Sequence, residues 1–291
     1  MNSQLLIHPR TASQLKRFIL DQHHGLILAG PEGSGKETLA MHVAAELLGI
    51  SPKALQQYPY YTVVNPKEQS ISIDEVRAAQ KLLTLRTPHT AQVIRRVILV
   101  INAERMRSEA QNAFLKSLEE PPEDTCIIFT TASVTGLLDT IRSRMRTIEV
   151  LPIDIVAAKT HYRTKGISAE SVEKNYALSQ GQAGLLHSLL DGSEAHELKE
   201  WVLAAKQLLA KTPGERLMDI DELSKDKGSV LLLLNALGRM THAALLHAGR
   251  TGARASIERW SKSSEAVLAA KESVRMNVNT KLVLDQLFLN L

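Results

Sequence analysis

Short apolar runs alternate with amphipathic segments over the first half of the chain. The runs Val97–Ile101 and Cys126–Thr130 are continuously apolar or nearly so, and a segment with apolar residues at helical spacing lies between them. Such runs are typical of parallel strands that are buried on both faces of a sheet. The apolar runs predict a five-stranded parallel sheet covered by helices, with strands near residues 26–29, 61–64, 97–101, 126–130 and 147–150.

Two of the predicted helices begin at recognisable capping sequences. Ser108 is followed three residues later by Gln111, and Ser72 is followed three residues later by Glu75. This is the spacing of a capping box, in which the serine hydroxyl accepts from a backbone N–H and the longer side chain reaches back to the serine N–H. We therefore expect helices to start at these two serines.

The pattern becomes wholly helical after residue 152. A chain of 291 residues is longer than a single core usually supports. We expect three domains: an α/β nucleotide-binding-like domain over residues 1–152, a small helical domain over 153–192 and an all-α domain over 193–291. An apolar helix over residues 277–289 lies close to the end of the chain, and such a helix usually docks on another surface.

The composition is that of an ordinary globular protein, with 44% hydrophobic and 23% charged residues. No run of about 18 apolar residues occurs, and the first residues lack the basic start and apolar core of a signal peptide. We expect a cytoplasmic location and no membrane contact. The net charge of +4 permits contact with nucleic acid but does not argue for it. With one cysteine, Cys126, and scattered histidines, we expect no metal site.

A glycine-rich loop follows the first predicted strand. The strand Gly25–Ala29 leads into Gly30-Pro-Glu-Gly-Ser-Gly-Lys-Glu37, and an amphipathic helix follows. Strand, glycine loop and helix in this order are the context of a phosphate-binding P-loop, whose backbone N–H groups and lysine face a phosphate. The residues that would bind a nucleotide are Gly30, Gly33, Ser34, Gly35, Lys36, Glu37 and Thr38.

Position 37 departs from the P-loop pattern. The pattern has a serine or threonine there to hold Mg²⁺, but this chain has Glu37, with Thr38 one residue late. A carboxylate can ligate Mg²⁺, yet its length and its charge beside the phosphates disfavour the usual geometry. Two interpretations stay open. The loop binds ATP or ADP without hydrolysis, or it is a structural turn with no ligand, and in neither case is a cofactor required.

The stretch from residue 95 to residue 146 resembles a known family. Asn112-Ala-Phe-Leu-Lys-Ser-Leu-Glu-Glu-Pro-Pro122, the apolar strand after it and Thr140-Ile-Arg-Ser-Arg144 are similar to the clamp-loader subunits of bacterial DNA polymerase III. That group lies within the AAA+ class and contains the tau/gamma motor subunits and the delta-prime subunit. The resemblance implies a P-loop AAA+ domain, a small helical lid and a helical collar through which the subunits form a ring.

The resemblance also implies which residues act on ATP. Motor subunits of the family end the third strand with Asp-Glu, and the equivalent positions here are Ile101 and Asn102. Neither side chain can place a metal or activate water, so we expect no ATP hydrolysis by this chain alone. The nearest carboxylate, Glu104, would need a shifted strand end to replace them.

The Ser-Arg dipeptide of the family is kept. By the resemblance its arginine, Arg144, is a finger that reaches ATP held by an adjacent subunit, a role that suits an always-charged guanidinium. The alternative is a solvated basic loop in which Arg142 and Arg146 also take part. The chain thus keeps the arginine of the finger but lacks the two acids. In the resembled family this combination is typical of the delta-prime subunit rather than of a motor.

Two sensing elements of the motors can be compared with this chain. Thr130 or Thr131, at the end of the fourth predicted strand, matches the polar residue with which motors detect the γ-phosphate. The sensor arginine that motors place in the lid is missing. Gly181 is followed here by Gln182, Ala183, Gly184 and Leu185.

The partners implied by the resemblance are the tau/gamma and delta subunits, the sliding clamp and primer-template DNA. Arg77 and Lys81, four residues apart on one helix face, are candidate phosphate contacts to that DNA, and the alternative is that both are simply solvated. Two other functions stay open. One is an ATP-hydrolysing tau/gamma-like motor that uses Lys36, Glu37 and Glu104 unconventionally, and the other is a freestanding DNA-binding protein.

Overall fold

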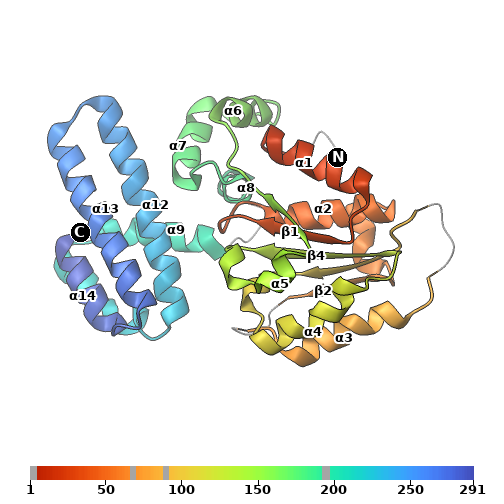
Figure 1. Cartoon of the computed structure of the whole chain (residues 1–291). Coiled ribbons are helices and arrows are strands. Elements are labelled where there is room, and N and C mark those ends of the chain that lie inside the picture. Colours follow the sequence, from red (N-terminus) through yellow and green to blue (C-terminus); the bar gives the residue numbers. More distant parts are fainter. Residues whose placement is uncertain (1–4, 66–69, 88–91, 192–196) are drawn as a thin grey trace. The chain divides into compact units, whose positions relative to one another are not determined.

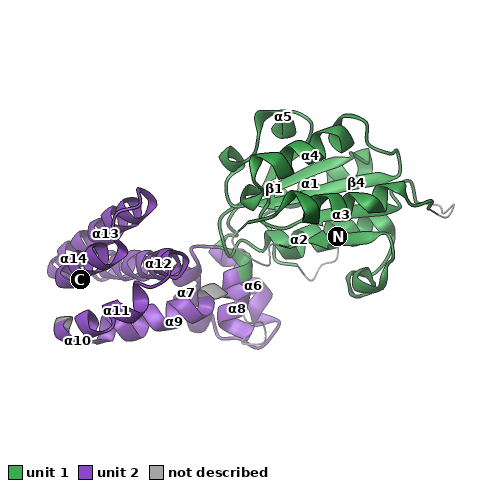
Figure 2. Cartoon of the chain, turned by 90° about the horizontal axis from the view of Figure 1, so that it is seen from below, with its two compact units in different colours: residues 1–154, 182–184 green, residues 155–181, 185–291 purple. Residues whose placement is uncertain are grey.

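The computed structural model describes residues 5–65, 70–87, 92–191 and 197–291. The chain divides into two compact units, which Figure 2 colours separately. Unit 1 comprises Met1–Asp154 and Gln182–Gly184, and unit 2 comprises Ile155–Gly181 and Leu185–Leu291. The predicted boundary at residues 152–153 lies close to the end of the first segment of unit 1. The predicted boundary at residues 192–193 lies outside the described residues, so the division into three domains stays a prediction.

Unit 1 is built on a parallel five-stranded sheet with helices on both faces, as the apolar runs predict (Figure 1). The order of the strands is β2-β3-β4-β1-β5, and every neighbouring pair is parallel. Strands β1, β3 and β4 are buried at every residue, which explains why their sequences are continuous rather than alternating. The bounds are β1 Gly25–Ala29, β2 Tyr61–Val64, β3 Arg96–Val100, β4 Thr125–Thr131 and β5 Arg146–Glu149.

The helices of unit 1 form a separate core on each face of the sheet (Figure 1). Helices α1 (Pro9–Asp21) and α2 (Lys36–Leu48) cover one face, where Phe18 and Val43 are fully buried. Phe114 is buried on the other face and meets Phe129 edge-on with ring centroids 5.2 Å apart. The helices of that face are α3 (Ile73–Gln80), α4 (Ser108–Glu119) and α5 (Asp139–Arg142), and the short helices of unit 1 are η1 (Pro52–Gln57), η2 (Lys81–Thr84), η3 (Ala103–Arg105) and η4 (Val134–Gly136).

The two predicted capping boxes have different outcomes. The Ser72 hydroxyl accepts from the Glu75 N–H and the Glu75 carboxylate accepts from the Ser72 N–H, as predicted. The box predicted at Ser108 is wrong, because α4 begins at Ser108 without a side-chain cap. Gln111 is buried, and its amide donates instead to the Gly136 carbonyl at 3.0 Å. The residue expected to close the box therefore anchors the loop that follows β4.

A buried ion pair joins the start of β3 to the loop before β4. Arg96 is 6% exposed, and its guanidinium donates to the Asp124 carboxylate at 3.0 Å and to the Leu82 and Leu83 carbonyls at 3.0 and 2.7 Å. Thr87 also donates to Asp124. Burial raises the pKa of Asp124, but the hydrogen bonds from Arg96 and Thr87 outweigh it and leave the pKa below its ordinary value. This pair holds three segments of unit 1 together.

The described residues of unit 2 form helices joined by short loops, which confirms the prediction of a helical second half (Figure 1). Leu234, Val267 and Phe288 lie in its core, on three different helices. The bounds are α6 Ile155–Arg163, α7 Ala169–Ser179, α8 Ala183–Asp191, α9 Glu197–Ala210, α10 Pro213–Met218, α11 Ile220–Leu223, α12 Lys227–Thr251, α13 Arg254–Arg275 and α14 Thr280–Asn290. Helix α8 begins in the short segment that belongs to unit 1.

One helix of the described residues, α12, is long and apolar enough to cross a membrane by length and composition. Its buried side chains, among them Leu233, Leu234 and Leu237, belong to the core of unit 2. The core helix of a globular domain needs this composition because it packs on several sides.

We expect Asp124→Asn to lower the free energy of unfolding by about 3–5 kcal/mol near neutral pH, because Arg96 would keep a buried charge without a counter-ion. The pKa of Asp124 is depressed in the folded protein, so its stabilisation is present above the ordinary aspartate pKa of about 3.9. That stabilisation is lost as the pH falls through the lower folded-state value. Denaturant unfolding at a series of pH values should show the two proteins converging in acid.

The control for this prediction is Glu258→Gln, which removes an exposed ion pair with Lys262. We expect that change to leave the free energy of unfolding nearly unchanged at any pH, because solvent screens this ion pair. Equal stability of Asp124→Asn and the unmodified protein near neutral pH would contradict the structural role given to Asp124.

Candidate functional site

The glycine-rich loop joins the end of β1 to the start of α2, as predicted. Gly33 and Gly35 have φ angles of 82° and 84°, in the left-handed region that glycine adopts without strain. A Cβ atom on Gly30 would lie 3.1 Å from the Ser34 hydroxyl and 3.2 Å from the Val150 side chain. The backbone therefore has the curled form of a P-loop, and its glycines stand where larger residues do not fit.

Lys36 is the first residue of α2 and is only 6% exposed. Burial lowers the pKa of its ammonium, while the carboxylates of Glu104, Glu37 and Glu32 act in the opposite direction. No hydrogen bond is formed by this ammonium within the described residues. The P-loop lysine thus interacts with acids of its own chain, and this negative charge opposes the approach of a triphosphate.

The two positions that follow β3 carry no acidic side chain. The strand ends at Val100, one residue earlier than predicted, and Ile101 is 8% exposed and packs in the apolar core. Asn102 is in the left-handed conformation with φ of 52°, and its N–H donates to the Thr130 hydroxyl at 3.0 Å. A P-loop motor places Mg²⁺ with a hydroxyl group and two carboxylates. Ile101, Asn102 and Glu37, which stand at those three positions here, do not form such a set. The described residues contain no group of three His, Cys, Asp or Glu side chains that could hold a metal.

The turn at Asn102 brings Glu104 to the site. Residues Ala103–Arg105 form η3, and one oxygen of the Glu104 carboxylate accepts from the Ala132 N–H at 3.0 Å, just beyond β4. Its other oxygen is buried and has no hydrogen-bond partner among the described residues. Of the three acids that interact with Lys36, Glu104 has the largest effect on its pKa. Whether Glu104 replaces the acids of the resembled motors stays a prediction.

Both threonines at the end of β4 are buried and used within the chain. Thr130 receives the Asn102 N–H, and the Thr131 hydroxyl donates to the Ser133 carbonyl at 2.8 Å. The position that resembles a polar sensor therefore also holds the turn after β3 in place.

The segment Gln182–Gly184 lies against the glycine-rich loop within unit 1. A Cβ atom on Gly184 would lie 2.9 Å from the Gly35 nitrogen and 3.0 Å from the Gly33 carbonyl oxygen, which is closer than real Cβ atoms come. The side-chain amide oxygen of Gln182 and the Ser34 hydroxyl are both buried without a hydrogen-bond partner among the described residues. Where the resembled motors have a sensor arginine, this chain has a close backbone contact with the loop.

Arg144 lies at the opposite edge of the sheet from the loop. Strand β5 begins at Arg146, which pairs with Leu26 near the start of β1, and a Cβ atom on Gly25 would lie 3.4 Å from the Arg144 carbonyl oxygen. At a rise of about 3.3 Å per residue, Gly25 and Ala29 are about 13 Å apart, and the loop begins only after Ala29. Arg144 therefore lies far from the glycine-rich loop of its own chain.

The side chain of Arg144 is 34% exposed and held by several contacts. Its guanidinium donates to Glu119 at 2.8 Å, at the end of α4, and to the Thr140 carbonyl at 3.0 Å. Arg142 and Arg146 each pair with an aspartate. A partly exposed ion pair is worth about 1 kcal/mol or less, so a triphosphate can compete with Glu119 for Arg144.

The predicted DNA-contact residues lie on or beside α3. Arg77 and Lys81 are both exposed, Arg77 on α3 and Lys81 directly after it. A parallel bridge between Met106 and the residue before Ser72 also brings the exposed Arg105 and Arg107 to the start of this helix. Arg105 and Arg107 were not predicted as DNA contacts from the sequence. An apolar methionine between two arginines nevertheless indicates a strand-like segment with one buried side chain.

The comparisons with known sequences match subunits of DNA polymerase III and small subunits of replication factor C. A family model described as "DNA polymerase III, delta subunit" matches residues 7–154. The DNA polymerase III subunit delta' of Pseudomonas aeruginosa is 35% identical over 211 residues, which are 65% of this chain and 62% of that protein. The Escherichia coli K12 subunit delta' is 29% identical over 187 residues, or 58% and 55% of the two chains. The matched region thus spans less than two thirds of the length of either relative.

A solved structure shares the fold. A DNA polymerase III gamma subunit-related protein from Thermotoga maritima matches with a TM-score of 0.55 and 22% identity, over 96% of this chain and 97% of that one. At this identity the likeness establishes the fold alone. It agrees with an AAA+ α/β domain followed by a largely helical region.

We expect Gly184→Ala to destabilise the protein by about 1–3 kcal/mol, because the added methyl group would overlap the backbone of Gly33 and Gly35. The control is Gly214→Ala, where nothing lies within 4 Å of the new methyl group. Alanine favours a helix by about 1 kcal/mol over glycine, so this control should be neutral or stabilising. Thermal unfolding of the two variants measures the difference, and equal melting temperatures would show that Gly184 does not press on the loop.

Proposed function

The chain belongs to the DNA polymerase III delta subunit family and is delta-prime-like, and on that premise we propose that it is a non-hydrolysing subunit of a clamp loader. In this proposal it joins ATP-hydrolysing subunits, supplies Arg144 to the ATP that a neighbour holds, and helps to load a sliding clamp on primed DNA. Its own loop binds nucleotide weakly or not at all.

The placement of Arg144 carries this proposal. Arg144 precedes β5 at the edge of the sheet where the strands begin, whereas the glycine-rich loop follows β1 at the edge where the strands end. A guanidinium in this position can grip two phosphate oxygens of an adjacent subunit. Its partly exposed contact with Glu119 would orient the side chain until that nucleotide is presented.

Three positions support the proposal that this chain does not hydrolyse ATP, one in the loop and two directly after β3. Ile101 is packed in the core, Asn102 has a left-handed backbone, and Glu37 replaces the hydroxyl that would hold Mg²⁺. In phosphoryl transfer, metal placement and water activation supply most of the catalysis, and these residues provide neither. The close contact of Gly184 with the loop favours weak binding or none over tight nucleotide binding.

The proposed partners are the tau/gamma and delta subunits, the sliding clamp and primer-template DNA. Leu268, Leu282 and Leu289 of unit 2 are 60%, 64% and 66% exposed, and we propose that α13 and α14 contact neighbouring subunits through them. Arg77 and Lys81 are the proposed contacts to DNA phosphates. The same role places the protein in the cytoplasm, beside bacterial DNA.

A second candidate function is an unconventional ATPase. The observation in its favour is Glu104, whose buried, unpaired oxygen lies at the end of the sheet where the glycine-rich loop begins and whose charge acts on Lys36. In that case Glu104 would take the part of the acids missing from β3.

We expect Arg144→Ala to lower the ATPase activity of the assembled clamp loader several-fold, because the neighbouring site would lose the guanidinium that stabilises the transferring phosphoryl group. The variant should still fold and join the complex, since the contact with Glu119 is partly exposed. Phosphate release by the loader reconstituted with tau/gamma and delta subunits measures the effect at saturating subunit.

Arg142→Ala is the matched control, because it removes the same charge two residues away and breaks another exposed ion pair. We expect near-normal ATPase activity from it. Unchanged activity with Arg144→Ala, or equal losses with both variants, would remove Arg144 from the mechanism.

The isolated protein should release no phosphate from ATP, with or without primed DNA, and Lys36→Ala and Glu104→Gln should leave this unchanged. The reason is that the chain lacks the groups that place Mg²⁺ and activate water. Steady turnover by the isolated protein that both substitutions abolish would establish the second candidate function instead.

A further inference from the structure

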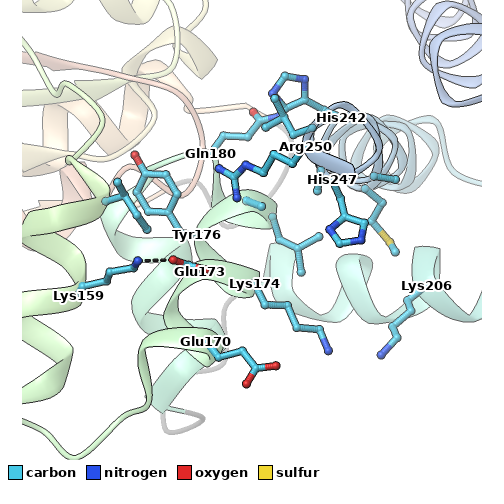
Figure 3. Close-up of a pocket in the computed structure, with 17 residues that line it drawn as sticks. Lys159, Glu170, Glu173, Lys174, Tyr176, Gln180, Lys206, His242, His247 and Arg250 are labelled. Atoms are coloured by element: carbon cyan, nitrogen blue, oxygen red, sulfur yellow. Dashed lines mark hydrogen bonds and ion pairs between the residues drawn. The ribbon is translucent and has the colours of Figure 1, made fainter. Parts of the chain in front are cut away.

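Unit 2 contains a groove that the proposed function does not use. It has a volume of about 1010 Å³ and lies between α6 and α7 on one side and α9 and α12 on the other (Figure 3). Every residue that lines it belongs to unit 2. The groove is therefore a feature of one compact body.

A hydrogen bond joins α7 and α12 beside the groove. The Arg239 guanidinium of α12 donates to the Ser179 carbonyl at the end of α7 at 3.0 Å. Farther along α12 the side chains that face α7 include Ala243 and Ala244, and α7 contributes Ala177. These small residues leave space that larger ones would fill.

The floor of the groove is apolar. Leu178 of α7 and Met240 and Leu246 of α12 line it together with the three alanines, and Leu246 is 45% exposed. Single exposed leucines are normal, but a continuous apolar floor in a groove is typical of a binding surface. Methionine adds an adaptable contact, because its side chain is flexible and polarisable.

The rim of the groove is basic. Four Lys or Arg side chains line it, against two glutamates. Lys159 pairs with Glu173, and Arg250 also acts on Glu173 and lowers its pKa after the effects of Lys159. Lys174 and Lys206, on α7 and α9, are exposed and have no acidic partner within the described parts of the chain (Figure 3). The groove therefore carries unbalanced positive charge above an apolar floor.

We propose that this groove binds an acidic amphipathic helix of a partner protein. The apolar face of such a helix would cover Leu178, Met240 and Leu246, and its acidic flanks would meet Lys174 and Lys206. The size fits, because two to three turns of a helix about 10 Å across occupy on the order of 1000 Å³. This site is separate from the glycine-rich loop and from Arg144.

A nucleic acid strand fits the groove less well. Strand binding without sequence preference needs aromatic platforms for the bases beside cations for the phosphates. Tyr176 is the one Phe, Tyr or Trp side chain among the residues that line the groove. The apolar side chains of the floor provide neither a positive charge nor a hydrogen-bond donor for a phosphate. The pairing of an apolar floor with a basic rim instead complements alternating apolar and acidic residues.

A displayed library of random peptides about 16 residues long, selected on the full chain, tests the proposal, since this length allows four helical turns. Enriched peptides should carry apolar residues at helical spacing and an excess of Asp and Glu. Fluorescence anisotropy of labelled examples gives their Kd. The double variant Lys174→Glu, Lys206→Glu should raise Kd about tenfold or more, and Leu246→Ser should also raise it.

The matched control is Lys225→Glu with Arg275→Glu, which makes the same change of charge at exposed residues of unit 2 outside the groove. It should leave Kd unchanged, and circular dichroism should show that all variants fold. The proposal is overturned if no peptide is enriched, if enriched peptides lack acidic residues, or if the groove variants bind as well as the unmodified chain. It is also overturned if a labelled oligo-dT strand binds and loses affinity in the same variants, since that would assign the groove to nucleic acid.

Discussion

The parallel direction of the five strands is the constraint on which unit 1 depends. All strands end at one edge of the sheet, so the glycine-rich loop after β1, the turn after β3 and the threonines of β4 gather there. All strands begin at the other edge, where Arg144 precedes β5. The length of β1 separates the two. A change in the loop therefore leaves the surroundings of Arg144 unaltered, and the proposed role of Arg144 does not depend on the loop of its own chain.

At the loop edge, residues that would handle a nucleotide contribute to packing and to internal bonds. Ile101 extends the apolar core, the Thr130 hydroxyl receives the Asn102 N–H, and Gly184 packs on the loop backbone. The charge of Glu104, a carboxylate of the same chain, acts on the pKa of Lys36 against the effect of burial. These interactions are local and compatible with one another, which explains how this edge of the sheet is stable without acids directly after β3.

The sequence predicts what depends on neighbours along the chain, and it misses what depends on distant partners. The strands follow from continuous apolar runs, and the Ser72 capping box follows from residues three positions apart. The box at Ser108 is not formed because Gln111 finds a better partner in Gly136, 25 residues away. The place of Glu104 depends on a left-handed turn at Asn102, and the groove of unit 2 is lined by residues of α6, α7, α9 and α12, which are far apart in the sequence. Neither has a signature in the sequence alone.

The most direct test is a structure of the assembled clamp loader with a non-hydrolysable ATP analogue and primed DNA. We expect the Arg144 guanidinium to leave Glu119 and to lie within hydrogen-bond distance of the γ-phosphate held by the adjacent subunit. We also expect no magnesium-bound triphosphate in the loop of this chain. A triphosphate and Mg²⁺ held against Glu37 or Glu104 of this chain, with Arg144 still paired to Glu119, would contradict this account.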